Sequence, residues 1–199
     1  HVRVADHREL LRSGDVPVRN STRVQPGQIR GVRADTGGRV EGLFLHDVAS
    51  SDRARRCRVL LKMKRNRPGA VISLERPSGD PSPFRLVIED QAEAPPGSAG
   101  SSEGGGWVVR VESDDSAPEH WLETVGLTPL PPYILAARRR ITGEFADAAD
   151  RIAYQTVFAS EPAAAASRPE HGSIAAPTAG LHFTTELLGR LRQRGVRAA

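Results

Sequence analysis

The sequence predicts an α/β fold combined with a small antiparallel β barrel or sandwich, and three observations lead to this prediction. Residues 173–199 run in the order strand, loop, helix and strand, which is typical of a parallel α/β sheet. Residues 29–111 contain about six β-rich segments with no helix between them, which indicates a barrel or a sandwich. At 199 residues, 38% of them hydrophobic, the chain can bury a sizeable core.

The first residues predict the end of a helix followed by a strand. Leu10–Asp15 contains a glycine suited to the position just past a last helical turn, and Val16–Val18 predicts a strand despite its proline. The next three residues, Asn20–Thr22, either hold a local turn or hydrogen-bond a polar substrate, and Arg23 adds a positive charge.

The β-rich region is punctuated by glycine, proline, aspartate and serine. Thr36–Gly38 predicts a hairpin turn, and residues 94–106, rich in Pro, Ser and Gly, predict a flexible hairpin loop rather than a domain boundary. The expected strands are Ile29–Ala34, Arg39–Val48, Arg56–Met63, Ala70–Leu74, Phe84–Glu93 and Trp107–Glu112.

The densest basic cluster lies between residues 53 and 67. Arg56, Arg58, Lys62 and Lys64 have even spacing, so in a regular strand they share one face. Such a face either follows a phosphate backbone or is simply solvated. The absence of interleaved aromatic residues slightly favours the solvated face.

Composition restricts the classes of function. The formal charge is +4, and all but two of the basic residues are arginine, which fits either an RNA partner or a GC-rich coding bias. The single cysteine, Cys57, excludes an internal disulfide framework, and the six histidines lack metal-ligand spacing, so no metal site is predicted. We expect a cytoplasmic protein without membrane contact, because the sequence has no long apolar run and no secretory signal at its start.

The segment after residue 113 mixes helices with a stiff linker. Residues 118–125 predict a short helix with Trp121, Leu122 and Val125 on one face, ended by a glycine. Three prolines then predict an extended segment over residues 126–134, either a wall that presents Tyr133 or a rigid connector. Apolar residues at helical spacing predict a further helix over Glu144–Ala159, and residues 162–169 a loop.

The stretch Ser173–Thr185 carries the clearest candidate site. Ser173–Ala176 predicts the end of a buried strand, and a threonine, Thr184 or Thr185, is suited to cap the following helix. The loop between them lies where α/β proteins bind ligands, beside unpaired N–H groups of a helix. His182 in this loop is either held by backbone bonds in a turn or acts as acid, base or donor.

The stretch Gly172–Thr184 resembles the signature of the S-adenosylmethionine:tRNA ribosyltransferase-isomerase family of queuosine biosynthesis. Three further stretches follow in the family's order. They are Asn20-x-Thr22-Arg23-Val24 followed by Thr36–Gly38, then Pro129–Ile134, then Tyr154–Ala159. This resemblance implies a three-layer α/β domain built from both ends of the chain, residues 1–27 and 113–199, with a β barrel inserted at residues 28–112.

The resemblance also implies an activity. The family transfers and isomerises the ribosyl group of S-adenosylmethionine onto 7-aminomethyl-7-deazaguanine at the wobble position of tRNA, giving epoxyqueuosine-tRNA and releasing adenine and methionine. S-adenosylmethionine is a substrate, no metal is implied, and we expect a monomer. The alternative is a non-catalytic RNA-binding fragment.

Site residues follow from the same resemblance. We expect His182 to act as a base or a hydrogen-bond donor. The basic cluster and Arg23 are expected to hold tRNA phosphates, and Tyr133 to pack on a base. The remaining candidates, for S-adenosylmethionine or another polar part of the substrate, are Thr178, Gly180, Thr184, Asn20 and Thr22.

Several positions depart from the family's pattern. Ser21 stands where members usually have Asp, Leu127 where they have His, and Ala153 where they have Arg, and residues 62–69 differ from the usual Arg-Pro-Gly-Lys segment. The family also begins before His1 and continues past Ala199, and a strand that starts at Val196 has no continuation. We therefore expect a fragment with part of its active site missing.

Overall fold

The chain divides into two compact units, and each is described by itself. The barrel unit comprises residues 26–131, and the terminal unit comprises residues 1–25 and 132–199. The computed structural model describes residues 10–50, 52, 54–64, 66–92, 106–114, 118–141, 147–159 and 172–197. The predicted loops at 94–105 and 162–169, and residues 144–146 of the predicted helix, lie outside these residues.

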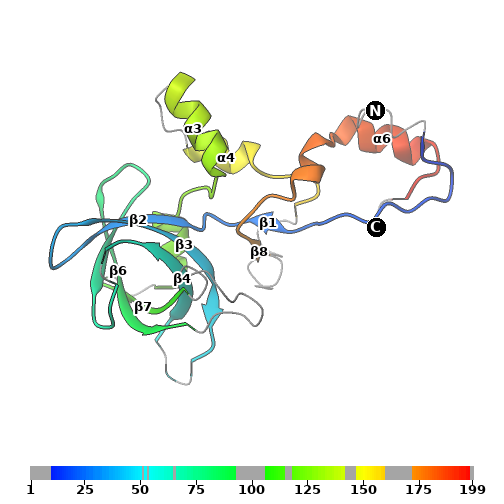
Figure 1. Cartoon of the computed structure of the whole chain (residues 1–199). Helices are drawn as coiled ribbons and strands as arrows, with labels where there is room; N and C mark the ends of the chain where they lie inside the picture. Colours follow the sequence, from blue (N-terminus) through cyan, green and yellow to red (C-terminus); the bar gives the residue numbers. More distant parts are fainter. Residues whose placement is uncertain are drawn as a thin grey trace, which may run out of the picture. The chain divides into compact units, whose positions relative to one another are not determined.

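The barrel unit contains a closed antiparallel barrel (Figure 1), whose six strands follow the order β2-β3-β4-β7-β6-β5. Inward side chains alternate with outward ones, as in β5, because successive residues of a strand point to opposite faces. The barrel is confirmed and the sandwich is excluded. Its strands are β2 (Gln28–Arg33), β3 (Arg39–Val48), β4 (Arg56–Lys62), β5 (Val71–Glu75), β6 (Pro81–Gln91) and β7 (Trp107–Ser113).

The turn predicted at Thr36–Gly38 joins β2 to β3. The Arg33 N–H donates to the Gly38 carbonyl at 2.9 Å, and the Gly37 N–H donates to the Arg33 carbonyl at 2.8 Å. Gly37 has a φ of 67°, a conformation that glycine adopts without the steric cost of a Cβ atom. The glycine therefore fits the turn that sets the register of this hairpin.

A short helical segment belongs to the barrel core. A 3-10 turn, η2 (Pro118–His120), leads into α2 (Trp121–Val125), and Trp121 and Val125 are completely buried. The ring of Trp121 meets Phe44 edge to face, with centroids 6.0 Å apart. The barrel unit is therefore wider than the residues 28–112 expected from the sequence, because this helix supplies part of its core.

The terminal unit pairs two strands that are far apart in the sequence. Strand β1 (Arg23–Val24) runs parallel to β8 (Gly172–Ser173), and the Gln25 N–H extends the pairing by donating to the Ser173 carbonyl at 2.8 Å (Figure 1). The helical elements are α3 (Pro132–Ile141), α4 (Asp147–Ala153), the 3-10 helix η4 (Thr178–His182) and α6 (Thr185–Gln193). None of the helices in the described ranges is long and apolar enough to cross a membrane.

Two strand predictions in this unit were wrong. The segment Val16–Val18 is not a strand, and Pro17 has no N–H to donate to a ladder. Val196 does not begin a strand either. It follows a turn at Gly195, donates to the Leu191 carbonyl at 3.1 Å and is buried.

Two further predictions placed the ends of elements incorrectly. The strand expected over Ser173–Ala176 ends at Ser173, because the Ser173 hydroxyl bonds both the N–H and the carbonyl of Ala175. The extended segment expected through Ile134 gives way to helix α3 at Pro132, since proline is well suited to a first helical position. The helix expected through Ala159 ends at Ala153.

Candidate functional site

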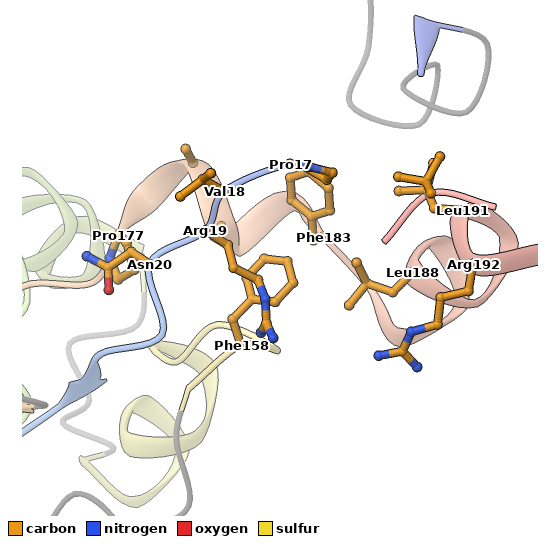
Figure 2. Close-up of a pocket in the computed structure, with 13 residues that line it drawn as sticks. Pro17, Val18, Arg19, Asn20, Phe158, Pro177, Phe183, Leu188, Leu191 and Arg192 are labelled. Carbon is orange, nitrogen blue, oxygen red and sulfur yellow. The ribbon is translucent and has the colours of Figure 1, made fainter. Parts of the chain in front are cut away.

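A cavity of about 180 Å³ lies within the terminal unit (Figure 2). Its walls come from the segment before β1, the turn after α4, the 3-10 helix η4, and α6 with the residues that follow it. Most lining side chains are apolar. The lining consists of Pro17, Val18, Arg19, Asn20, Phe158, Pro177, Ala179, Gly180, Phe183, Leu188, Leu191, Arg192 and Val196.

Two aromatic rings and an arginine meet at one wall. The rings of Phe158 and Phe183 have centroids 5.4 Å apart with their planes tilted by 55°. The guanidinium carbon of Arg19 lies 4.9 Å from the Phe158 ring centroid, within the range of a cation–π interaction (Figure 2). Arg19 therefore holds the chain before β1 against the turn after α4.

Gly180 allows η4 to pack closely on that turn. A Cβ atom at this position would lie 2.9 Å from the Thr156 methyl group and 3.6 Å from the ring of Phe158. The Gly180 N–H donates to the Pro177 carbonyl at 2.8 Å. Gly180 thus lines the cavity as a tightly packed backbone, with its own N–H already used.

His182 is the last residue of η4, and its neighbour Phe183 lines the cavity while His182 itself does not. The imidazole is exposed, and no described residue hydrogen-bonds its ring. The interpretation of a histidine held by hydrogen bonds in a turn is therefore not supported. The ring is free to meet a molecule that approaches from solvent.

The helix cap was predicted correctly. Thr184 precedes α6, and its hydroxyl accepts the Leu187 N–H at 3.1 Å, which identifies Thr184 rather than Thr185 as the cap. This bond satisfies one of the N–H groups expected to face a ligand. Thr178 and Thr184 are both exposed, and neither lines the cavity.

The residues before β1 form the local turn that was one of two predicted alternatives. The side-chain oxygen of Asn20 accepts both the N–H of Thr22, at 2.8 Å, and its hydroxyl, at 2.7 Å. Because both donors face the oxygen, the amide NH₂ of Asn20 points elsewhere, and no described residue accepts from it. Asn20 thus offers a donor at the cavity rim (Figure 2).

Sequence reasoning missed the role of Gln155. Its side-chain oxygen accepts the Val24 N–H at 3.0 Å, and its NH₂ donates to the Val24 carbonyl at 2.8 Å. The amide therefore satisfies both backbone groups of Val24 on β1. The only available signal was the stretch Tyr154–Ala159, which carries the family resemblance but does not indicate this pairing.

Arg23 and Tyr133 remain candidates without a contact to the cavity lining. Arg23 is half-buried on β1, and its guanidinium has no partner among the described residues. Tyr133 belongs to α3 and is 69% exposed. The structure thus brings Asn20 and Gly180 together at the cavity and leaves the other candidates of this unit outside its lining.

The candidate phosphate ligands of the barrel unit lie on β4 and just beyond it. Arg56 is paired with Asp52 and with Glu89, at 2.6 Å from the Glu89 carboxylate, and Glu89 also binds Arg110 at 2.9 Å. The hydrogen bond from Arg56 is the main cause that lowers the pKa of Glu89, followed by that from Arg110. Lys62 and Lys64 are exposed, and Arg58 is half-buried. Arg56 is therefore neutralised by its neighbours.

Charge is divided unevenly between the two units. The terminal unit has 14 basic residues and 9 acidic ones, whereas the barrel unit has 14 basic and 15 acidic residues. The positive surplus of the chain lies entirely in the terminal unit. The barrel cluster noticed in the sequence is locally dense but balanced by acids.

The described residues show no group of three or more His, Cys, Asp or Glu side chains placed to hold a metal ion. Cys57 lies inside the barrel, where burial raises the pKa of its thiol to about 12. A neutral, buried thiol is a poor nucleophile. We therefore assign no chemistry to it.

Comparison with known proteins identifies the family. The profile of a family described as queuosine biosynthesis protein matches residues 1–199. The chain belongs to this family. It is 37% identical over 191 residues to the S-adenosylmethionine:tRNA ribosyltransferase-isomerase of Trichlorobacter lovleyi, covering 96% of this chain and 45% of the relative.

Other members of the family show a similar level of sequence identity to this chain. The enzyme of that name from Geobacter metallireducens is 38% identical, and the one from Staphylococcus epidermidis is 35% identical. These alignments cover 96% and 100% of this chain but 45% and 47% of the relatives, so the chain spans about half the length of each. The crystal structure of S-adenosylmethionine tRNA ribosyltransferase from Thermotoga maritima aligns with a TM-score of 0.30 at 16% identity, covering 98% of this chain and 42% of that one, which is too weak to support an argument.

Proposed function

We propose that the protein acts as an S-adenosylmethionine:tRNA ribosyltransferase-isomerase. It would transfer and isomerise the ribosyl group of S-adenosylmethionine onto 7-aminomethyl-7-deazaguanine at the wobble position of tRNA, yielding epoxyqueuosine-tRNA and releasing adenine and methionine. The observation that carries this proposal is the family match over residues 1–199, with relatives of that name at 35–38% identity. The setting is the cytoplasm, the active form is a monomer, and no metal takes part.

The proposal extends to the architecture. The terminal unit is the α/β catalytic domain, a three-layer fold of which β1 and β8 form neighbouring parallel strands. The parallel pairing of these two strands, from segments about 150 residues apart, supports this assignment. The barrel unit is the inserted domain.

The cavity of the terminal unit binds only part of S-adenosylmethionine. Its volume of about 180 Å³ lies below the ~300–1,000 Å³ of sites that enclose a whole drug-sized ligand. Apolar walls with donors at the rim, from Asn20 and Arg192, suit a flat ring that carries acceptor nitrogens. We assign the cavity to the adenine ring.

The exposed imidazole of His182 then acts as the base. The sulfonium of S-adenosylmethionine acidifies the neighbouring ribose carbon, and His182 accepts the proton from it as the sugar opens and adenine departs. A neutral imidazole is the side chain best suited to this step near pH 7. Thr178, the first residue of the same 3-10 helix, is exposed, and we assign its hydroxyl to a polar group of the same substrate.

The test is the release of adenine and methionine when the full chain is incubated with S-adenosylmethionine and tRNA that bears the 7-aminomethyl-7-deazaguanine precursor. His182→Ala is expected to reduce adenine release by at least ~10²-fold. His120→Ala, which changes an exposed histidine of the barrel unit, is the matched control and should leave the rate unchanged. Near-normal release by His182→Ala would remove the proposed role.

A second pair of variants tests the cavity. Leu188→Phe places a ring in the cavity and should weaken S-adenosylmethionine binding. Leu187→Phe makes the same change on α6 at a residue that does not line the cavity. Equal binding by both variants would show that the adenine ring binds elsewhere.

A non-catalytic RNA-binding protein is the alternative, and the family match and the names of the relatives favour the enzyme over it. Binding of tRNA without release of adenine would support this candidate over the enzyme.

A further inference from the structure

Several arginines of the barrel unit are engaged with acids. Glu89 binds both Arg56 and Arg110, and Glu112 lies between Arg110 and Arg85. Arg85 also binds Asp114 at 2.8 Å. Each of these pairs reduces the charge available to an outside anion. The excess of positive charge that would attract a large polyanion therefore lies on the terminal unit.

Helix α3 (Pro132–Ile141) in the terminal unit combines positive charge with an exposed aromatic ring. It contains three consecutive arginines near its C-terminal end and no acidic residue. Cations at this end are favoured by the helix dipole. The helix itself is therefore positively charged and contains no acidic side chain that would offset this charge.

The two faces of α3 have different roles. Arg138 points to α4, where its two terminal nitrogens meet both carboxylate oxygens of the buried Asp150 at 2.5 Å. Tyr133, Ala136 and Arg140 follow at spacings of three and four residues, so they share another face, and all three are exposed. The Arg140 guanidinium has no partner among the described residues. Arg138 thus fixes α3 to α4, while Arg140 is available to bind a ligand.

We propose that this exposed face of α3 binds an unpaired nucleotide of the tRNA substrate. Tyr133 stacks on the base, and Arg140 binds a backbone phosphate. The two residues are separated by about 10 Å along the helix. The small side chain of Ala136 between them leaves room for a base to approach the tyrosine ring. The identity of the RNA as tRNA rests on the proposed function, whereas the binding face follows from the exposed side chains of α3.

The chemistry of the face favours RNA over a protein partner. Aromatic side chains bind unpaired bases by stacking, and arginine binds phosphates with two nitrogens at once. A protein that docked on Tyr133 and the nearby Ile141 would have to desolvate Arg140, a charge without a described counterion. An RNA strand supplies that counterion.

The test measures the affinity of the full chain for an unmodified tRNA transcript over a range of salt concentrations. Arg140→Gln is expected to lower the slope of log affinity against log salt by about 1, the loss of one phosphate contact. Tyr133→Leu is expected to weaken binding by roughly 5- to 150-fold without changing that slope, because it removes stacking only. Tyr133→Phe should bind like the unaltered chain.

The matched control is Arg39→Gln. Arg39 is an exposed arginine of the barrel unit without a partner among the described residues, so this change removes the same charge from the other unit. It should leave both affinity and slope unchanged. Equal losses from Arg39→Gln and Arg140→Gln would overturn the proposal in favour of a general attraction to net charge, and so would unchanged binding by Tyr133→Leu.

Two results separate this inference from the proposed function. If the chain binds tRNA and both α3 variants bind it equally well, only the binding face is wrong. If the folded chain binds no tRNA, the proposed substrate fails as well. A blunt RNA duplex should compete poorly, and competition equal to that of tRNA would exclude an unpaired nucleotide. Self-association that Tyr133→Leu abolishes would identify a protein contact instead and overturn the proposal.

Discussion

The barrel unit buries a large apolar core, whereas the terminal unit leaves several of its large apolar side chains exposed. The barrel closes on itself and therefore has no free strand edge. In the terminal unit, the described sheet consists of two short parallel strands. Among the described residues, every exposed large hydrophobic side chain lies in the terminal unit. These are Leu10, Val16, Val18, Tyr133, Ile141, Ile152 and Val157.

This difference indicates a division of roles. Parallel sheets are normally covered on both faces, so the apolar surface of the terminal unit is suited to further contacts. The same unit holds the cavity, the exposed His182 and the positive surplus. The barrel unit has a complete core and balanced charge. We therefore expect stability to be concentrated in the barrel unit and binding in the terminal unit.

The largest expected effect is on the barrel core. Trp121→Ala removes a completely buried ring that packs against Phe44 and should lower the free energy of unfolding of the barrel unit by about 3–5 kcal/mol. Denaturant unfolding measures this loss. Trp121→Phe is the control. It keeps a ring and removes an indole N–H that has no partner among the described residues, so its cost should be much smaller. Similar costs for the two variants would show that ring packing does not support the core.

Gln155 tests the terminal unit in the same way. Gln155→Leu leaves the N–H and carbonyl of Val24 without partners on that side, and because Val24 is only 6% exposed the change should cost about 2 kcal/mol or more. Hydrogen exchange of the Val24 amide should accelerate, while barrel amides stay protected. Gln193→Leu, an exposed change at the end of α6, is the control. An unchanged exchange rate of the Val24 amide would show that the Gln155 side chain does not protect β1.

The same contrast explains what the sequence could predict. The barrel strands were placed within three residues at every end, because alternation of inward and outward side chains along a strand is a strong local signal. Gly126 and the cap at Thr184 were also identified, since each acts within a few residues of its own position.

The elements of the terminal unit were harder to predict because side chains take over backbone hydrogen bonds there. The Ser173 hydroxyl ends β8, and the Gln155 amide pairs with β1 from a distance of 131 residues in sequence. Neither bond leaves a periodic pattern. The cavity also depends on segments that meet only in the fold, so the sequence indicated Gly180 and Asn20 without showing that they share a wall.

Close packing beside the cavity gives an effect of intermediate size. Gly180→Ala places a Cβ atom 2.9 Å from the Thr156 methyl group and should cost about 1–2 kcal/mol, since a side-chain methyl yields more readily than backbone. Combining it with Thr156→Ser, which removes that methyl, should recover much of the loss. Additive costs in this double-mutant cycle would show that the clash lies elsewhere.

The smallest effect is a pH dependence that should arise in the barrel unit. Hydrogen bonds from Arg56 and then Arg110 lower the pKa of Glu89 in the folded state. A lowered folded pKa means that the stabilisation is present above the unfolded value of ~4.3 and is lost as pH falls through the folded value. Unfolding of the barrel unit should therefore become easier below about pH 4.3, and Glu89→Gln should flatten this dependence. Glu123→Gln, at an exposed position of α2, should not flatten it. If both variants kept the full dependence, the ion pairs of Glu89 would not contribute to the stability of the barrel unit, and its resistance would rest on the apolar core alone.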